Sequence, residues 1–504
     1  MKKIILILAI IILGSVACED QLYQDPISVM SSNGFFRNDA DFNAALSGVY
    51  SSMHNYPWRE FYLSDVRSDN MYGVGEAGVR DHEPINNFAK TIAGNTYMSE
   101  AWSSNYTGIM RANTILDNIG NGKLSSEAVK LNIEAQTKFL RAFFYFDLVK
   151  LFGKVPKIDR LMTPNDLLSL GRSPVADIYD LIISDLTFAI TNLDEYYAKG
   201  TANCGRATKN AARGLLAKVY LTRSGPTYGI EGPGLGTNDY AAALSLLNDV
   251  ISSAHYDTLS NYASIFVTTN ENNKEVVFDI QFIKGGQNAG ADYPGEFCCQ
   301  QWWKSVGYPY DIGLENKDVS ESLIGKFDKV KDERYAASIQ LGYIPPSTGV
   351  YTYDPCVIKY CSKLSSEWGN NRFDFPQNYI VIRYTDILLM KAECILQGAT
   401  GSQADVNNIV NGIRKRAGLA ALPGNVTLDD LLAERQKEFL GEGQRWGDLV
   451  RTGKVLDVIN AWIPVEDIKH QMATSIDANM IIYPVPEAQI ILKAGLYTQN
   501  EGYE

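Results

Sequence analysis

The chain has 504 residues and a mass of 55.9 kDa, too long for one small core, which suggests about three domains or one large body built from repeats. Hydrophobic residues make up 45% and charged residues 21%, a composition that excludes wholesale disorder. The formal net charge is −12, and without basic clusters a nucleic-acid partner is not expected. The 7 Trp, 29 Tyr and 19 Phe are enough for an amphipathic binding surface as well as a core.

The N-terminus has the order of an export signal. Lys2 and Lys3 precede an apolar run at 4–13, and small residues follow it. The run is shorter than the roughly 20 apolar residues that cross a bilayer. No other apolar stretch approaches that length, so we expect a soluble body behind the signal.

Residues 15–18 (SVAC) resemble a bacterial lipobox, in which the cysteine is acylated and becomes the new N-terminus. The resemblance predicts a lipoprotein signal peptide at 1–17, lipidation of Cys18 and a lipidated tether at 18–30. An ordinary cleaved signal with a coincidental cysteine is the alternative. Glu19 and Asp20 resemble the acidic tag that sends lipoproteins to the outer cell surface. We therefore expect an outer-membrane protein that faces the exterior and is held by its acyl chains.

The remaining cysteines and histidines do not predict a metal site. None of the six cysteines forms a C-x-x-C motif, and the four histidines are scattered singly. Neither a metal nor a cofactor is therefore expected. Cys356 and Cys361 have a spacing that permits a hairpin disulfide in an exported protein, whereas the alternative is that all six remain thiols.

Most of the chain has the periodicity of helices. Segment 134–152 is apolar on most of its circumference, which predicts a helix covered on several sides, and Gly153 and Pro156 end it. The same reasoning predicts further helices at 175–193, 210–222, 240–252, 387–396 and 404–416.

The predicted helices repeat as pairs. Ala392 and Ala404 occupy the two positions at which the tetratricopeptide template requires small residues, although Asn408, Asn411 and Arg416 do not fit its later positions. Comparable pairs join 41–54 with 102–119, 139–145 with 182–189, and 210–222 with 240–252. We therefore predict a mainly α fold of about four tetratricopeptide-like helix pairs, because a stack of pairs buries one continuous core.

Long inserts interrupt these pairs or follow them, and such loops usually carry function. The largest insert alternates like a strand at 274–282, and 357–360 is a second candidate strand. Because Gly, Pro, Asn and Tyr are dense between them, we expect loops and short strands there rather than more helices. The inserts are 57–98, 153–173, 224–238 and 253–376.

Seven motifs follow one another along the chain. They are 139–156 (FLRAFFYFDLVKLFGKVP), 205–220 (GRATKNAARGLLAKVY), 379–392 (YIVIRYTDILLMKA), 413–419 (IRKRAGL), 434–451 (ERQKEFLGEGQRWGDLVR), 483–490 (YPVPEAQI) and the ending QNEGY at 499–503. In this order they resemble the SusD/RagB family of surface nutrient-binding lipoproteins. The ending is similar to the family's QNPGY, with Glu501 where Pro is usual.

The resemblance covers almost the whole chain and implies a single α-helical domain at 31–504 on four tetratricopeptide-like pairs. It also implies docking to a SusC-like TonB-dependent outer-membrane transporter. The ligand, usually a glycan and sometimes a peptide, is expected to bind among the loops. A helix-repeat scaffold for the transporter with no small ligand is a third possibility.

The sequence predicts no enzyme. Glu434, Glu438 and Glu442 fall on one helical face, a pattern that could suggest acid catalysis, but we expect them to pair with Arg383, Arg435 or Arg445 in a buried network. The sequence contains no G-x-S-x-G, H-E-x-x-H or Walker motif. No catalytic residue is therefore assigned.

Two loop segments carry the rings and polar groups that a glycan site needs. By their position in the family, we expect them to line the ligand site. If Trp302 and Trp303 lie on a strand, only one of them faces the ligand. Trp368 and Arg372 form a third, weaker candidate. The expected ligand-binding residues are Arg67, Asp69, Asn70 and Tyr72 in one segment and Trp302, Trp303, Tyr308 and Tyr310 in the other.

Overall fold

The computed structural model describes residues 35–75, 81–286, 289–312 and 318–503. The predicted signal peptide (1–17), the predicted lipidation site Cys18 and the predicted tether (18–30) lie outside these ranges. Within the described residues, no helix combines the length and the apolar character needed to cross a membrane.

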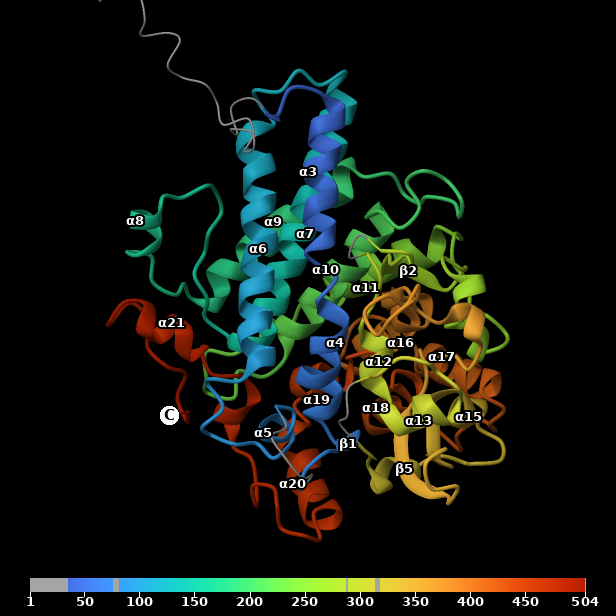
Figure 1. Ribbon diagram of the computed structural model, residues 1–504. Helices are drawn as coiled ribbons and strands as arrows, with labels where there is room; N and C mark the ends of the chain where they lie inside the picture. Colours follow the sequence, from blue (N-terminus) through green and yellow to red (C-terminus); the bar gives the residue numbers. More distant parts are fainter. Residues whose placement is uncertain (1–34, 76–80, 287–288, 313–317, 504) are drawn as a thin grey trace, which may run out of the picture.

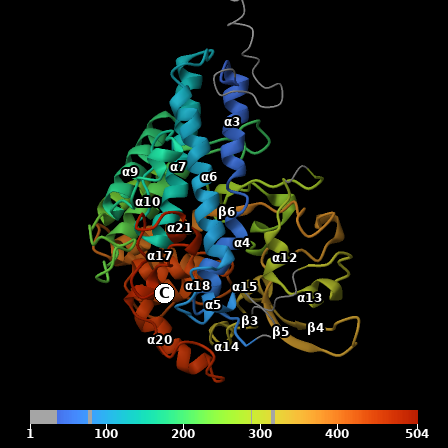
Figure 2. The same ribbon diagram turned by 60° about the vertical axis from the view of Figure 1, so that its left-hand side comes forward.

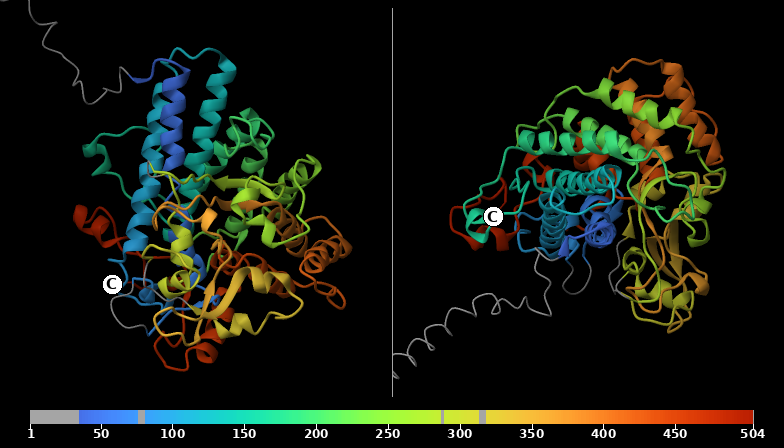
Figure 3. Two further views of the ribbon diagram at one scale, coloured as in Figure 1. Left: turned by 45° about the vertical axis from the view of Figure 1, so that its right-hand side comes forward. Right: turned by 90° about the horizontal axis from the view of Figure 1, so that it is seen from above.

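Four helix pairs form the body of the protein, and each pair contacts the next (Figure 1). The predicted mainly α fold of about four pairs is confirmed. Seen from above, the pairs follow one another from the blue end of the chain to the orange segment (Figure 3). The pairs are α3 (Asp39–Ser51) with α6 (Thr96–Asn118), α7 (Glu127–Phe152) with α9 (Val175–Asn192), α10 (Lys209–Ser224) with α11 (Tyr240–Ser252), and α16 (Tyr384–Leu396) with α17 (Gln403–Arg416).

Helix α7 shows why the sequence located its end better than its start. The helix begins at Glu127, because the Ser126 side chain accepts a hydrogen bond from the Val129 amide and caps it. Its first turns are polar and partly exposed, so the apolar pattern alone placed the start at 134. The helix ends at Gly153, whose φ is +66° and whose Cα lies against the Glu231 carbonyl, which leaves no room for a side chain.

Short elements fill the inserts and the C-terminal part of the chain. The large insert contains four short helices, so the expectation of only loops and strands there is wrong. The helices outside the four pairs and before α16 are α4 (Tyr56–Glu60), the π-helical turn η1 (Phe61–Val66), α5 (Glu83–Asn86), α8 (Pro164–Leu167), the 3-10 turns η2 (Ala263–Ile265) and η3 (Thr268–Asn270), α12 (Tyr293–Phe297), α13 (Gln300–Ser305), α14 (Glu321–Ile324), α15 (Glu333–Ser338) and the 3-10 turn η4 (Ser365–Glu367). After α17 come α18 (Leu428–Glu438), α19 (Arg445–Arg451), α20 (Val455–Glu466), the 3-10 turn η5 (Ala478–Ile481) and α21 (Glu487–Leu492).

The strands form three antiparallel two-stranded ladders in the described residues. The predicted strand at 274–282 is confirmed as β2 (Val276–Ile280), which pairs with β6 (Tyr379–Arg383). The predicted strand at 357–360 is wrong beyond Val357, because β5 (Thr352–Val357) ends there and pairs with β4 (Ile339–Tyr343). The third ladder joins β1 (Met71–Tyr72) to β3 (Asp318–Val319).

Residues far apart in the sequence share one core. The largest cluster of buried apolar side chains extends from Phe42 in α3 to Val485 near the C-terminus. A second cluster gathers around α19 and α20, and a third around α16 to α18. The yellow segment with α12, α13, β4 and β5 lies to one side of the long helices (Figure 2). The helix pairs therefore act as the frame against which this segment packs.

Candidate functional site

Segment 300–311 forms a short helix and a turn. Trp302 and Trp303 lie on α13, not on a strand, and both are buried, with exposed fractions of 1% and 0%. Tyr308 is also buried, whereas Tyr310 is 42% exposed. The expectation that one of Trp302 and Trp303 faces the ligand, together with Tyr308, is not met in this structure, because α13 packs both tryptophans into the core and Tyr308 is buried as well.

Five aromatic rings pack together around Tyr308, and we call them the Tyr308 cluster: Trp303, Tyr308, Tyr310, Trp368 and Phe375. Trp303, Tyr308 and Phe375 are its buried members. Tyr308 stacks on Phe375 with ring centroids 5.5 Å apart, and its centroid lies 5.6 Å from Tyr310 and 5.4 Å from Trp368. Trp303 closes the cluster from inside, 5.1 Å from Tyr308. The structure thus brings the predicted segment 300–311 together with Trp368, the weaker candidate.

The loop that carries Trp368 is held in place by polar contacts. The Trp368 indole N–H donates to the Ser362 carbonyl at 2.8 Å, and the half-buried ring keeps part of its surface open. Asp374 accepts hydrogen bonds from the amide of Gly285 at 3.0 Å and from the Asn370 side chain at 2.7 Å. The loop therefore presents its exposed residues from a defined backbone.

Phe373 and Arg372 lie on the same loop and are exposed. Phe373 is 55% exposed, and the Arg372 guanidinium lies 4.5 Å from its ring centroid. Next to them, Asn370 and Asn371 are also exposed. We use the name Tyr310 face for Tyr310 and Trp368, which both contact Tyr308, together with Arg372 and Phe373 of the Trp368 loop. With the neighbouring asparagines, these residues offer flat rings, a guanidinium and amide groups, which bind hydroxyl groups in pairs.

The polar side chains of segment 65–72 bind other groups of the protein and do not form a binding surface. Arg67 is buried against the Phe88 ring at 4.4 Å, and its guanidinium donates to the carbonyls of Ile85 and Met480, both at 2.8 Å. Tyr72 is half-buried, and its hydroxyl donates to Asp467 at 2.9 Å.

Asp69 and Asn70 are equally buried and bound to protein groups. Arg445 grips both oxygens of Asp69, at 2.7 and 2.9 Å, and Asn70 donates to Asp65 at 2.7 Å. Burial raises the pKa of Asp69, but Arg445 and Lys326 outweigh it and lower that pKa to about 2. The expectation that Arg67, Asp69 and Asn70 contact a ligand is therefore wrong for this conformation, since each is enclosed by its own partners.

A second polar surface, which the sequence did not single out, lies where α4, α6 and α12 meet. Trp58 is half-buried, and its ring lies 5.0 Å from that of Tyr97. Burial, followed by the charge of Glu296, raises the pKa of Asp292 to about 7, and Glu100 also contributes. We call Trp58, Glu100, Asp292 and Glu296 the Trp58 face. The only sequence signal for it was a tryptophan inside a long insert.

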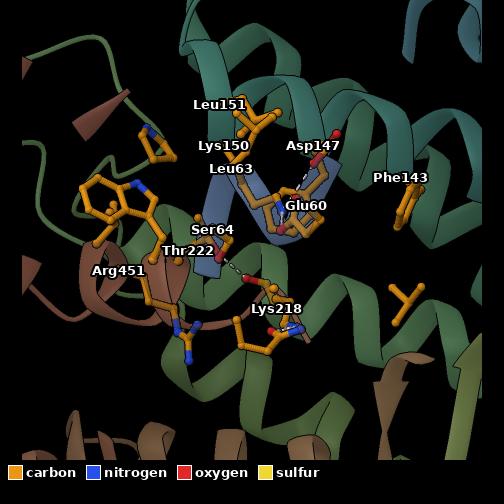
Figure 4. A pocket seen from close by; sticks show the side chains of 18 of the residues that line it. Glu60, Leu63, Ser64, Phe143, Asp147, Lys150, Leu151, Lys218, Thr222 and Arg451 are labelled. Atoms are coloured by element: carbon orange, nitrogen blue, oxygen red, sulfur yellow. Dashed lines mark hydrogen bonds and ion pairs between the residues drawn. The ribbon is translucent and has the colours of Figure 1, made fainter. Parts of the chain in front are cut away.

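The chain also encloses a cavity of about 70 Å³ between η1, α7, α10 and α19 (Figure 4). Lys150 lies between Glu60 and Asp147, at 3.4 and 3.5 Å, and Lys218 binds Asp386 at 2.9 Å. Among the described residues, Glu60 Oε2 finds no hydrogen-bond partner. Since one water needs about 10–15 Å³ of such space, the cavity fits a few waters but no sugar ring. It is not the ligand site.

The acidic residues of α18 are in an ion-pair network. Arg383 binds Glu438 and Glu442, both at 2.8 Å, which confirms one expected partner. The other two expected partners bind elsewhere, because Arg435 pairs with Asp386 and Asp448 and Arg445 pairs with Asp69. Glu434 instead pairs with Arg334 and Arg414.

The environment of Glu438 suits a permanently charged group. Burial raises the pKa of Glu438, but Arg416, Arg383 and Arg334 outweigh it and hold that pKa well below its ordinary value. A general acid needs the opposite shift, towards neutral pH. Across the described residues, no three His, Cys, Asp or Glu side chains gather as a metal site.

Two family models match the chain. Residues 25–221 match a SusD-like family described as "Starch-binding associating with outer membrane", and residues 328–503 match the SusD family. The chain belongs to the SusD family. Neither description names a catalysed reaction, and the first associates its members with the outer membrane.

Curated SusD-family proteins match over most of their length. The chain is 26% identical to the SusD-like protein P25 of Formosa agariphila, covering 92% of this chain and 93% of that protein. It is also 26% identical to the starch-binding protein SusD of Bacteroides thetaiotaomicron, covering 75% of this chain and 74% of SusD.

Solved structures share the SusD-family fold. Surface glycan-binding protein A from Bacteroides fluxus has a TM-score of 0.79 at 23% identity, with 93% of this chain and 100% of that chain covered. The surface glycan-binding protein A from Bacteroides thetaiotaomicron, in complex with laminarihexaose, has a TM-score of 0.77 at 23% identity, with coverages of 92% and 100%.

Proposed function

We propose that the protein is a surface lipoprotein that binds oligosaccharides or polysaccharides and delivers them to a SusC-like TonB-dependent transporter in the outer membrane. The observation that carries the glycan proposal is the Tyr310 face. Tyr310 and Trp368 expose ring surface, and both pack against the buried Tyr308, which stacks on Phe375. Rings held in this way lose little conformational freedom when a sugar stacks on them.

The relatives support the class of ligand. The SusD relative is named for starch binding, and one similar structure was solved with a hexasaccharide. The proposed site differs from the sequence-based placement in its residues but keeps Tyr310 and the segment around it. Arg372 and the neighbouring asparagines would hydrogen-bond the sugar hydroxyls that ring stacking leaves at the edges.

Calorimetric titration of the chain from residue 19 onward with a panel of soluble polysaccharides and oligosaccharides tests the proposal. The double variant Tyr310→Ala/Trp368→Ala should weaken the best ligand roughly tenfold or more, since each ring contributes on the order of 1 kcal/mol. Tyr351→Ala is the matched control, because Tyr351 is an exposed tyrosine (56%) of the β4–β5 hairpin. Equal losses in both variants, or no binding to any glycan, would contradict the proposal.

The second candidate, capture of peptides, rests on the Trp58 face. A tryptophan beside carboxyl groups suits a basic or N-terminal amine as well as a sugar. Trp58→Ala with Glu100→Gln should then abolish binding to a panel of basic peptides and leave the glycan panel unchanged. The glycan function is preferred, because the Tyr310 face exposes more ring surface and carries no cluster of like charges.

The anchor and the delivery step need separate tests. Cys18→Ala should release the protein from the membrane fraction, and the unchanged protein should carry acyl chains on Cys18 by mass spectrometry. Deleting the neighbouring transporter should stop uptake of the bound glycan while binding at the cell surface persists. If uptake continues at the same rate, delivery to that transporter is wrong.

A further inference from the structure

Three cysteines meet where the segment after α12 packs on β5. Cys298 follows α12, Cys356 lies on β5, and Cys361 lies five residues further along the chain; all three side chains are buried. The Sγ atoms of Cys298 and Cys356 are only 2.8 Å apart. Of the three thiols, these two are therefore in direct contact across elements that are 58 positions apart in the sequence.

The two sulfurs are closer than non-bonded thiols normally approach each other. The Cys298 thiol can donate to the Val357 carbonyl at 3.0 Å while the Cys356 thiol donates to Cys298, but a sulfur–sulfur distance of 2.8 Å is short even for such a hydrogen bond. Loss of both thiol hydrogens relieves the crowding, and a movement of less than about 1 Å brings the sulfurs to a bond length of about 2.05 Å.

We propose that Cys298 and Cys356 form a disulfide in the exported protein. The pairing differs from Cys356–Cys361, which their spacing in the sequence permits. Cys361 lies close by, but its Sγ contacts the carbonyls of Pro294 and Val357, at 3.3 and 3.7 Å. The inference rests on the proposed export, because only an oxidising compartment maintains such a bond.

The chemistry is thiol–disulfide exchange with a disulfide oxidant, either a thiol oxidoreductase of the export compartment or a low-molecular-weight disulfide. The Cys356 thiolate attacks the oxidant and forms a mixed disulfide, which releases one oxidant thiol. The Cys298 thiolate then attacks the Cys356 sulfur and releases the second. The cysteine pair is oxidised, the oxidant disulfide is reduced to two thiols, and the two cysteine protons end on those thiols.

The bond must form before this region closes. Both sulfurs are buried in the folded protein, and burial raises the pKa of Cys298 and of Cys356. Buried thiols of this kind are protonated and unreactive. Once formed, the bond is shielded from reductants for the same reason.

The link would constrain the segment that carries Tyr310, one residue of the Tyr310 face. The loop that it closes contains α13, Tyr310 and β4. Closing a loop of this length restricts the unfolded chain, which corresponds to a rise in melting temperature of about 4 °C for a protein of this size. The ring-bearing segment is thereby tied to the β4–β5 hairpin.

Peptide mapping of the full chain decides the pairing. Protein recovered from the membrane fraction is alkylated in denaturant without reductant and cut with trypsin. Cleavage at Lys304 and Lys359 places Cys298 and Cys356 on different peptides, 285–304 and 335–359, and puts Cys361 on a third, 360–363. We expect a cross-link between the first two peptides and alkylated Cys361. Alkylated Cys298 and Cys356 in the membrane-bound protein, or a cross-link to 360–363, would overturn the proposal.

Matched variants separate Cys298 from its neighbour Cys299, which lies on the same peptide. Cys299→Ser should keep the cross-link, because Cys299 contacts Tyr343 and Asp354 instead. Cys298→Ala should abolish it. A cross-link that survives in Cys298→Ala and disappears in Cys299→Ser would overturn the assignment.

Refolding in vitro separates this inference from the proposed location. The chain refolded with oxidised glutathione should melt about 4 °C above the same chain refolded with reductant, and Cys298→Ala should show no such difference. If the protein is absent from the membrane fraction, the proposed location is wrong. Peptide mapping of the oxidatively refolded protein then tests whether Cys298 pairs with Cys356. A different pairing, or none, after oxidative refolding overturns the disulfide.

Discussion

Arg383 on β6 and Glu438 at the end of α18 form an ion pair of 2.8 Å, although 55 positions separate them in the sequence. Both side chains are almost completely enclosed, with exposed fractions of 1% and 0%. Arg383 also binds Glu275 and Glu442, so one guanidinium connects the strand ladder of the insert to the C-terminal helices. The frame is therefore joined by buried charges as well as by apolar packing.

Arg383→Met should lower the free energy of unfolding by about 3–5 kcal/mol, because it leaves three buried carboxylates without their shared cation. Denaturant titration measures the change. The matched control is Arg160→Met, since Arg160 is exposed and pairs with Asp159 at the surface; it should change stability by less than about 1 kcal/mol. If the two variants lower the free energy of unfolding by similar amounts, the ion pairs of Arg383 do not stabilise the fold as described.

Removal of an inner ring and removal of an outer ring should have different effects. Trp303→Ala empties a fully buried site and should lower the free energy of unfolding by about 3–5 kcal/mol. Tyr310→Ala removes a ring that is 42% exposed and should leave stability within about 1 kcal/mol while it weakens glycan binding. Thermal unfolding and calorimetric titration of both variants measure the two properties. A stable Trp303→Ala variant would show that the Tyr308 cluster is not packed as described.

The pH dependence of stability should carry a contribution from Asp279. Burial raises its pKa from 3.8 to about 7, although hydrogen bonds from Gln281 and Asn378 oppose the shift. The folded state therefore binds a proton between these two values that the unfolded state does not, so this contribution to stability increases as pH falls from about 8 towards about 4.

Asp279→Asn isolates that contribution. At about pH 8 the variant should be more stable than the unchanged protein by about 2–4 kcal/mol, because it avoids a buried charge, and the difference should shrink by about pH 5. Thermal unfolding of both proteins across this range, at constant ionic strength, measures the difference. Parallel curves would mean that Asp279 has an ordinary pKa.

Two glycines allow a test of backbone strain. Gly153→Ala should lower the free energy of unfolding by about 2 kcal/mol or more, because φ is +66° and the new Cβ would lie 2.0 Å from the Glu231 carbonyl oxygen. Gly412→Ala, inside α17 with no atom within 4 Å of the new Cβ, should instead stabilise the protein by up to about 1 kcal/mol. Opposite signs in denaturant titration confirm the description of the α7 terminus.

The sequence by itself determined the helical frame. The apolar periodicity of 240–252 and 175–193 reproduces α11 and, within one residue, α9, because long amphipathic helices show their buried face in the sequence. The pairing into four repeats followed from the order of these helices. Glu434, Glu438 and Glu442 were also correctly assigned to ion pairs, since buried carboxylates need cations nearby, although α18 ends at Glu438 and Glu442 lies beyond it.

Only the tertiary structure decided which polar and aromatic residues are exposed. Trp302, Trp303 and Tyr308 have the residue types of a sugar platform, but a short helix turns them into the core, and Asp69 and Asn70 are enclosed by α18 and α19 from the far end of the chain. The periodicity of a six-residue helix is too short to predict its inward face. The partners of Cys298, Asp69 and Arg383 lie 58, 376 and 55 positions away in the sequence, so the residues around each of them do not predict the contact.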